Sequence, residues 1–187
     1  KPRQIAARIL FEWEVGNQFA ESILREHLTQ SNLKPIDRHM VQEMVFGVIR
    51  NLILLDSWID EKATRPPGKT RARTMLRLGL YQIAFMDRIP EHAAVHETVA
   101  TARDLRLHSQ SGFINAILRG FLRDKEAILK RLETWKTMAP SKAYSHPEWL
   151  IHKWKKQFGD SSTIALLDWN NQIPSTYARW NPLCGSV

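Results

Sequence analysis

The chain has 187 residues, of which 43% are hydrophobic and 25% charged, and its net charge is +8. This composition supports a folded core and excludes global disorder, while the basic balance favours a polyanionic partner. No apolar run is long enough to span a bilayer, so we expect no membrane partner. The one cysteine, Cys184, excludes an internal disulfide framework and is typical of a reducing compartment such as the cytoplasm.

The first half of the chain predicts helix after helix. Apolar residues at helical spacing predict a helix over 2–15, ended by Gly16-Asn17, and then a short helix with Ile23, Leu24 and Leu28 on one face. The next helix begins near Pro35, with Asp37 as its expected cap, and its apolar stripe continues through Leu52. Gly47 lies inside this helix, which predicts that a neighbouring helix approaches closely there.

The second half of the helical series centres on one apolar segment. Met75 to Phe85 is apolar on nearly every side, so we expect it to be the central, buried helix. A loop at 66–68 precedes it, and Pro90 opens the helix that follows. Further helices are expected around Phe113–Phe121 and around Leu129. No segment before residue 140 alternates with the period of a strand, so the prediction is an all-α fold.

The character of the chain changes after Pro140. Four tryptophans fall within 32 residues, namely Trp149, Trp154, Trp169 and Trp180. Residues 147–158 predict a helix ended by Gly159, with a second helix capped by Ser161 or Ser162 and reaching about Asn171. We therefore expect a helical domain over residues 1–140, and over 141–187 a Trp-rich helical linker together with the truncated start of a further module. The chain starts with Lys1 rather than Met, and we expect it to be a segment of a longer protein.

Several phrases occur in a characteristic order. They are DRHMVQEMVFGVIR (37–50), LGLYQIAFMDRIPEHAAVHETV (78–99), SGFINAILR (111–119) and SHPEWL (145–150), followed by Phe158-Gly159 and Arg179-Trp180-Asn181. This order resembles the RsmB/Sun/Fmu family of 16S rRNA cytosine-C5 methyltransferases, in which a NusB-like helical bundle precedes a catalytic module that uses S-adenosyl-L-methionine. The resemblance implies an RNA-binding bundle, followed by a linker that leads into a catalytic module missing from this chain.

The chemistry of cytosine methylation explains why we assign no catalytic residue. In the family that the chain resembles, a cysteine thiolate adds to the base and a second cysteine assists product release. Cys184 stands in neither motif, and the eight glycines form no cluster of the kind that cradles a cofactor at the start of a helix. We expect no catalytic site, no cofactor site and no activity in this chain alone.

Basic side chains are the candidate RNA-binding residues. Lys69, Arg71, Arg73 and Arg77 place four positive charges within nine residues with no acid among them, at a helix start where the helix dipole opposes positive charge. Arg119 and Arg123 lie behind the Phe113 stripe. The resemblance adds Arg3 and Arg8, because the N-terminal basic segment of NusB contacts RNA. The alternative for all eight is a solvated surface held by ion pairs; for Arg38 we favour such a structural ion pair.

Two other groups of residues have alternative interpretations. His92 and His96 have the spacing of metal ligands, but Ala93 replaces the glutamate of the zinc-protease motif and no third ligand is evident, so we expect no metal site. The tryptophans after residue 140 could stack on bases, although packing in a core or domain interface is favoured.

We therefore expect this chain to position ribosomal RNA for a catalytic domain that follows it. The expected partners are ribosomal RNA and the protein's own C-terminal catalytic domain, with another protein as a further candidate. The alternatives are a protein-interaction module or a standalone NusB-type antitermination factor.

Overall fold

The computed structural model describes residues 2–68, 70–175 and 177–180. These residues form helices joined by short loops and contain no strand, which confirms the all-α prediction. In chain order the helices are α1 (Pro2–Val15), α2 (Ala20–Gln30), α3 (Pro35–Arg50), α4 (Leu52–Lys62), α5 (Arg71–Phe85), α6 (Glu91–Asp104), α7 (His108–Arg123), α8 (Lys125–Met138), α9 (Pro140–Ala143), α10 (Glu148–Phe158) and α11 (Asp160–Asn171). None of them is long and apolar enough to cross a membrane.

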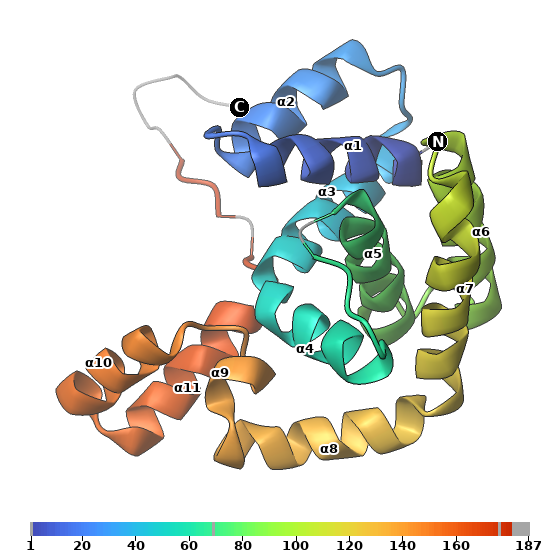
Figure 1. The fold of residues 1–187 in the computed structure, drawn as a ribbon. Coiled ribbons are helices and arrows are strands. Elements are labelled where there is room, and N and C mark those ends of the chain that lie inside the picture. Colours follow the sequence, from blue (N-terminus) through green and yellow to red (C-terminus); the bar gives the residue numbers. More distant parts are fainter. Residues whose placement is uncertain (1, 69, 176, 181–187) are drawn as a thin grey trace.

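Helix α5 is the centre of the larger unit. It packs against α1, α3, α4, α6 and α7, which surround it in Figure 1. Eleven of its 15 residues are buried, more than in any other described helix. This confirms the prediction of a central helix from Met75 to Phe85, since a segment that is apolar on every side can only be stable when other helices cover all of its faces.

The close approach predicted at Gly47 is also confirmed. A Cβ atom at this position would lie 2.0 Å from Cζ of Tyr81, so only glycine lets α3 lie against the Tyr81 ring. Tyr81 in turn stacks on Phe85, with 5.3 Å between the ring centroids. Burial raises the pKa of the Tyr81 hydroxyl to about 12, and the nearby Glu43 carboxylate acts in the same direction.

The predicted helix through Leu52 is wrong in one respect, because the chain turns at Asn51. The buried Asn51 side chain donates from Nδ2 to the carbonyl of Gly47 at 2.9 Å, and α3 ends at Arg50. A separate helix, α4, then begins at Leu52. Asparagine ends a helix because its side chain competes for backbone partners. Asp37 is not the cap of α3 either; Lys34 occupies that position and Asp37 lies in the first turn.

A smaller unit follows the bundle. Helix α8 runs along the lower edge of Figure 1 and leads to a lobe made of α9, α10 and α11. The lobe has its own small core, built from Ala143, Tyr144, Ile151 and Leu167. Gly159 ends α10 as predicted, with a φ of 80° that favours glycine. The predicted cap of α11 is wrong, since Gly159 precedes the helix and Ser161 and Ser162 lie within it.

A long-range hydrogen bond ties the lobe to the bundle, where α9 also lies against α4. The backbone amide of Ile53, in the first turn of α4, donates to Oγ of Ser145 at 2.8 Å. First-turn amides have no partner within their own helix, so Ser145 satisfies a group that would otherwise need water. Ser145 has a positive φ of 57°, an uncommon conformation for a residue with a side chain.

We predict that Gly47→Ala destabilises the protein. The added methyl group collides with a buried aromatic ring, and overpacking of this kind costs about 1–3 kcal/mol of unfolding free energy. Gly112→Ala is the matched control, because Gly112 is a helical glycine of α7 with no atom near its Cβ position, and there alanine should be neutral or stabilising by up to about 1 kcal/mol. Urea unfolding followed by circular dichroism measures both. Equal stability of the two variants would contradict the close packing of α3 on Tyr81.

Candidate nucleic-acid interface

The basic first turn of α5 divides into two kinds of arginine. Arg71 and Arg73 are its first and third residues, and the turn contains no acid. Oγ1 of Thr70 accepts a hydrogen bond from the Arg73 amide and caps the helix. Arg71 is exposed, whereas the Arg73 side chain is 11% exposed. The two side chains therefore face different surroundings although they are two residues apart.

Arg73 and Arg77 belong to a buried ion cluster. Oδ1 of Asp56, in α4, pairs with Nε of Arg73 at 2.8 Å and with Nε of Arg77 at 2.7 Å. Arg73 also pairs with Asp60 at 2.6 Å, and Arg77 pairs with Glu14 of α1. Burial lowers the pKa of Arg73, but its hydrogen bonds and charge interactions with Asp56 and Asp60 outweigh this effect and raise the pKa above its ordinary value. These two guanidinium groups join α1, α4 and α5, and their charges are matched within the protein.

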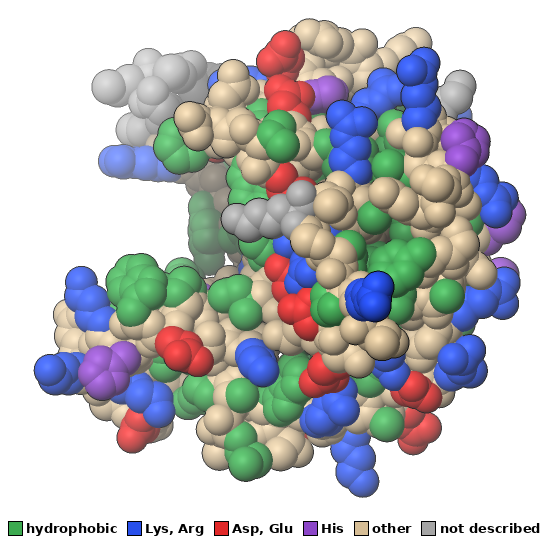
Figure 2. Space-filling model, viewed as in Figure 1, with side chains coloured by type: hydrophobic (Ala, Val, Ile, Leu, Met, Phe, Trp, Pro, Cys, Tyr) green, Lys and Arg blue, Asp and Glu red, His purple; other side chains and the backbone are tan. Residues whose placement is uncertain are grey.

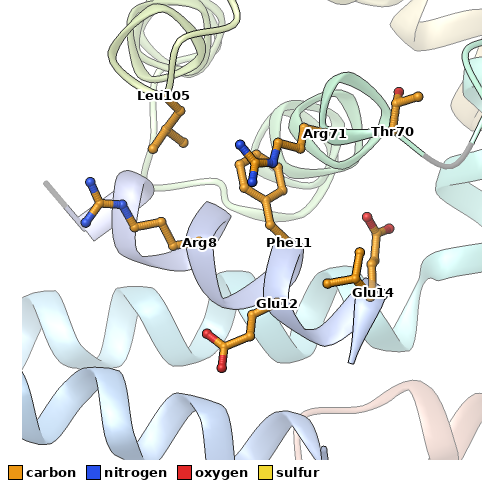
Figure 3. A pocket seen from close by; sticks show the side chains of 8 residues that line it. Arg8, Phe11, Glu12, Glu14, Thr70, Arg71 and Leu105 are labelled. Atoms are coloured by element: carbon orange, nitrogen blue, oxygen red, sulfur yellow. The ribbon is translucent and has the colours of Figure 1, made fainter. Parts of the chain in front are cut away.

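Arg8 and Arg71 instead face a shared cavity of about 450 Å³ (Figure 3). Arg8 comes from α1 and Arg71 from the start of α5, and Phe11 lies between them. The Arg71 guanidinium lies 5.2 Å from the centroid of the Phe11 ring, a cation–π contact that holds the planar group in place. Leu105, at the end of α6, completes the apolar part of the lining.

The acids of this cavity are engaged elsewhere. Glu12 accepts a hydrogen bond from His27 at 2.9 Å, and Glu14 accepts hydrogen bonds from Arg77 and from Thr74. Arg8 and Arg71 make no ion pair with any residue that the structure describes. The cavity therefore combines two cations that have no ion-pair partner among the described residues, an aromatic ring and the amino-terminal end of α5, an arrangement that suits an anionic ligand.

The other candidate residues lie apart from the cavity. Arg3 of α1 is half-buried and donates to Oε1 of the fully buried Gln82 at 2.6 Å. Burial lowers the pKa of Arg3, and the Glu97 carboxylate offsets part of this effect. Arg119 donates to Asn115 at 3.0 Å, and Arg123 is exposed at the end of the same helix, α7. Lys69 lies outside the described residues.

Arg38 has backbone partners. Its Nε donates to the carbonyl of Leu33 at 3.2 Å, and Nη2 donates to that of Ser31 at 3.4 Å. The side chain is structural, as expected, but no carboxylate within the described ranges pairs with it. It satisfies carbonyls in the loop after α2, which have no helical partner of their own.

Metal and nucleophile candidates gain no support from geometry. In the part of the chain that the structure describes, no three His, Cys, Asp or Glu side chains gather in a way that could hold a metal ion. His96 is exposed and its Nδ1 lies 3.3 Å from the neighbouring Glu97 carboxylate. Cys184 lies outside the described residues.

The tryptophans of the smaller unit are divided between a packed and an exposed set. The helix predicted over 147–158 is confirmed as α10, but its buried face centres on Ile151 and Trp154. Trp149 is 67% exposed and Trp169 is 68% exposed. Core packing does not account for Trp149 and Trp169 within the described residues, and packing of these two rings in a domain interface stays a prediction.

Sequence reasoning did not single out Phe11 or Leu105. Phe11 follows Arg8 by three residues, so the two share a face of α1, and this spacing could have indicated an arginine beside an aromatic ring. Leu105 reaches the cavity from α6, far away in sequence, and no local pattern could have predicted its place.

Comparison with known proteins agrees with this architecture. The NusB family model matches residues 1–123, which cover α1 to α7. The chain belongs to the NusB family. Residues 146–187 match a second model, the ferredoxin-like domain of RsmF/B-like methyltransferases. The NusB-family bundle and the second match are separated by residues 124–145, where α8 and α9 lie, and the domain boundary predicted at residue 140 falls within this segment.

The similar proteins carry names from ribosomal RNA modification. The chain is 33% identical over 183 residues to a protein of Synechocystis sp. named probable ribosomal RNA small subunit methyltransferase B. It is 34% identical over 183 residues to proteins of Yersinia pseudotuberculosis and Yersinia pestis named ribosomal RNA small subunit methyltransferase B. In each comparison 97% of this chain aligns with 41% of the relative, so the NusB-family chain spans about two fifths of these proteins.

We predict that Arg77→Leu strongly destabilises the bundle. It leaves the carboxylates of Glu14 and Asp56 partly buried without this cation, and removing one member of a buried ion pair costs about 3–5 kcal/mol of unfolding free energy. Arg71→Leu is the matched control, because the same change at an exposed position of the same helix should cost less than about 1 kcal/mol. Chemical denaturation of both variants tests this. A loss below about 1 kcal/mol for Arg77→Leu would show that the cluster does not hold the helices together.

Proposed function

We propose that this chain is the RNA-binding N-terminal region of an S-adenosyl-L-methionine-dependent small-subunit rRNA cytosine-C5 methyltransferase. The observation that carries the proposal is the pair Arg8 and Arg71. They face one cavity from two helices of a NusB-family bundle, and neither has a carboxylate partner in the described part of the chain.

The cavity has the chemistry to hold two phosphates of RNA, one at Arg8 and one at Arg71. A guanidinium group is planar and matches the oxygens of a phosphate with two parallel hydrogen bonds. Phe11 positions Arg71 and limits its freedom, so less conformational entropy is lost on binding. The dipole of α5 favours negative charge near the first turn of this helix, where Thr70 and Arg71 line the cavity. Contacts of this kind position the RNA backbone without reading its sequence.

The methyl transfer itself is assigned to the part of the whole protein that lies outside this chain. S-adenosyl-L-methionine would supply the methyl group there. The present chain has no glycine-rich turn and no second cysteine, so its residues do not fit that cofactor or that reaction. We infer that it binds ribosomal RNA and holds it for the catalytic domain, with the whole protein acting in the cytoplasm.

The match of residues 146–187 supports this proposal over a standalone antitermination factor. It extends the similarity beyond the NusB-family bundle into a domain of RsmF/B-like methyltransferases. The relatives named as methyltransferases likewise align with 97% of the chain and not with the bundle alone. A protein-interaction module remains the second hypothesis, since several large apolar side chains are exposed, among them Phe19 and Ile36.

We predict that Arg8→Glu combined with Arg71→Glu weakens binding to a structured rRNA fragment. Two phosphate contacts are lost, so the slope of log affinity against log salt should become shallower by about 1.8 on duplex regions and about 1.4 on single strands. Fluorescence anisotropy titrations at several KCl concentrations measure this slope. Arg73 is left unchanged because a glutamate there would lie beside Asp56 and Asp60 and would weaken the fold.

Arg119→Glu combined with Arg123→Glu is the matched control, since it removes the same charge from a different face, on α7. If this control weakens binding and the Arg8/Arg71 variant does not, the cavity is not the RNA site. If both variants bind like the parent chain, the electrostatic proposal is wrong and the protein-interaction hypothesis takes its place.

A further inference from the structure

Helix α10 presents a face that combines an aromatic ring with positive charge. Trp149, His152, Lys153 and Lys156 are all exposed. They occupy positions i, i+3, i+4 and i+7, so they lie on one side of the helix. With a rise of about 1.5 Å per residue, the face extends for about 10 Å. We refer to these four residues as the α10 face.

The opposite side of α10 is anchored in the lobe. Ile151 is buried, and Trp154 packs on the cluster formed by Tyr144 and Leu167. The ring of His146 lies 5.7 Å from that of Trp154. Since these contacts fix the rotation of the helix about its axis, the α10 face is held outward. The smaller unit shows hydrophobic, basic, acidic and histidine side chains close together in Figure 2.

The charge of this face is not neutralised within the described chain. Lys153 and Lys156 take part in no ion pair there, whereas Lys155, on another side of the helix, pairs with Asp160 at 2.9 Å. Next to the face lies a hollow of about 640 Å³, lined by Trp149, His152 and Met138 together with Lys142 and Lys155. Glu148 is the one acid among the residues that line it.

We propose that the α10 face binds single-stranded RNA, with a base stacked on Trp149 and phosphates paired with Lys153 and Lys156. An aromatic ring beside cations is the common element of surfaces that bind single strands. A duplex keeps its base faces stacked inside, so it offers Trp149 no partner. Burial of this face under another protein domain would instead remove two lysines from water, which is unfavourable unless each finds an acid.

This inference rests on the proposed function, because it names RNA as the ligand, but it uses other residues than the Arg8 cavity. The two surfaces belong to different units, separated by α8 (Figure 1). An experiment can therefore reject RNA binding at one surface and still support it at the other.

Trp149→Ala in the 187-residue chain tests the stacking contact. The probes are a fluorescein-labelled oligouridylate and a labelled RNA duplex of the same length, each titrated by fluorescence anisotropy. Loss of one stacked base should weaken binding of the single strand at least about fivefold and leave its salt dependence unchanged. Binding of the duplex should stay within about twofold of the parent. Trp169→Ala is the matched control, because Trp169 is as exposed as Trp149 but lies on α11.

Lys153→Glu combined with Lys156→Glu tests the charges. The log–log salt slope for the single strand should become shallower by about 1.4, corresponding to two phosphates. The charge-matched control is Arg88→Glu with Lys130→Glu, two exposed residues away from both proposed surfaces.

Several results would overturn the proposal. Unchanged binding of the single strand by Trp149→Ala would do so, as would an equal loss for single strand and duplex. If Trp149→Ala lowers the melting temperature, Trp149→Phe and Trp149→Leu replace it; both keep apolar bulk, and the Phe variant should bind the single strand more tightly than the Leu variant. If these variants bind RNA normally and Arg8→Glu/Arg71→Glu loses RNA binding, the α10 face is not an RNA site and the proposed function still holds. If these variants lose RNA binding and Arg8→Glu/Arg71→Glu binds normally, the Arg8 cavity is not an RNA site.

Discussion

The buried guanidinium of Arg77 is the constraint on which the bundle depends. A cation with 5% of its surface exposed needs anionic partners, and Arg77 takes Glu14 from α1 and Asp56 from α4. These partners fix the positions of both helices against α5. Arg8 and Phe11 lie on the same helix as Glu14, and Arg71 lies six residues before Arg77. The ion cluster therefore helps to set the geometry of the candidate RNA cavity, and Glu14, a member of that cluster, also lines the cavity.

The helical pattern of this fold was predictable because it is local. Apolar spacing predicted the central helix correctly, and Gly47 indicated a close contact before the contacting ring of Tyr81 was known. The break at Asn51 was missed because the apolar stripe continues across it, and only the hydrogen bond from the asparagine to Gly47 shows where α3 ends. Periodicity reports which side of a helix faces a core, but it does not report side-chain competition for the backbone.

The candidate site was predictable only in part, for the opposite reason. A basic cluster at residues 69–77 is visible in the sequence. Which of its arginines are buried in ion pairs and which are exposed depends on acidic partners that are distant in the chain. Asp56 and Glu14 lie 21 and 63 residues from Arg77. One local signal was present: a charged residue inside a helix that is apolar on all sides must be paired when buried. Applied to Arg77, it indicates a structural role, whereas nothing local distinguishes Arg71 from Arg73.

The phrase at residues 145–150, which carried much of the sequence resemblance, has a structural explanation. Ser145 caps α4 of the bundle, and the His146 ring packs on Trp154 within the lobe, while Ser141 donates to the carbonyl of His146 at 2.7 Å. The segment thus adds to the contacts that join the two units, which also meet through α8 and where α9 lies against α4. If the two proposed surfaces bind one RNA strand, a fixed junction raises the effective concentration of the strand at the second surface, and a loose linker would lower that advantage. We infer that the uncommon backbone conformation of Ser145 is a local cost of this junction, because the Ser145 hydroxyl accepts the hydrogen bond from α4 there.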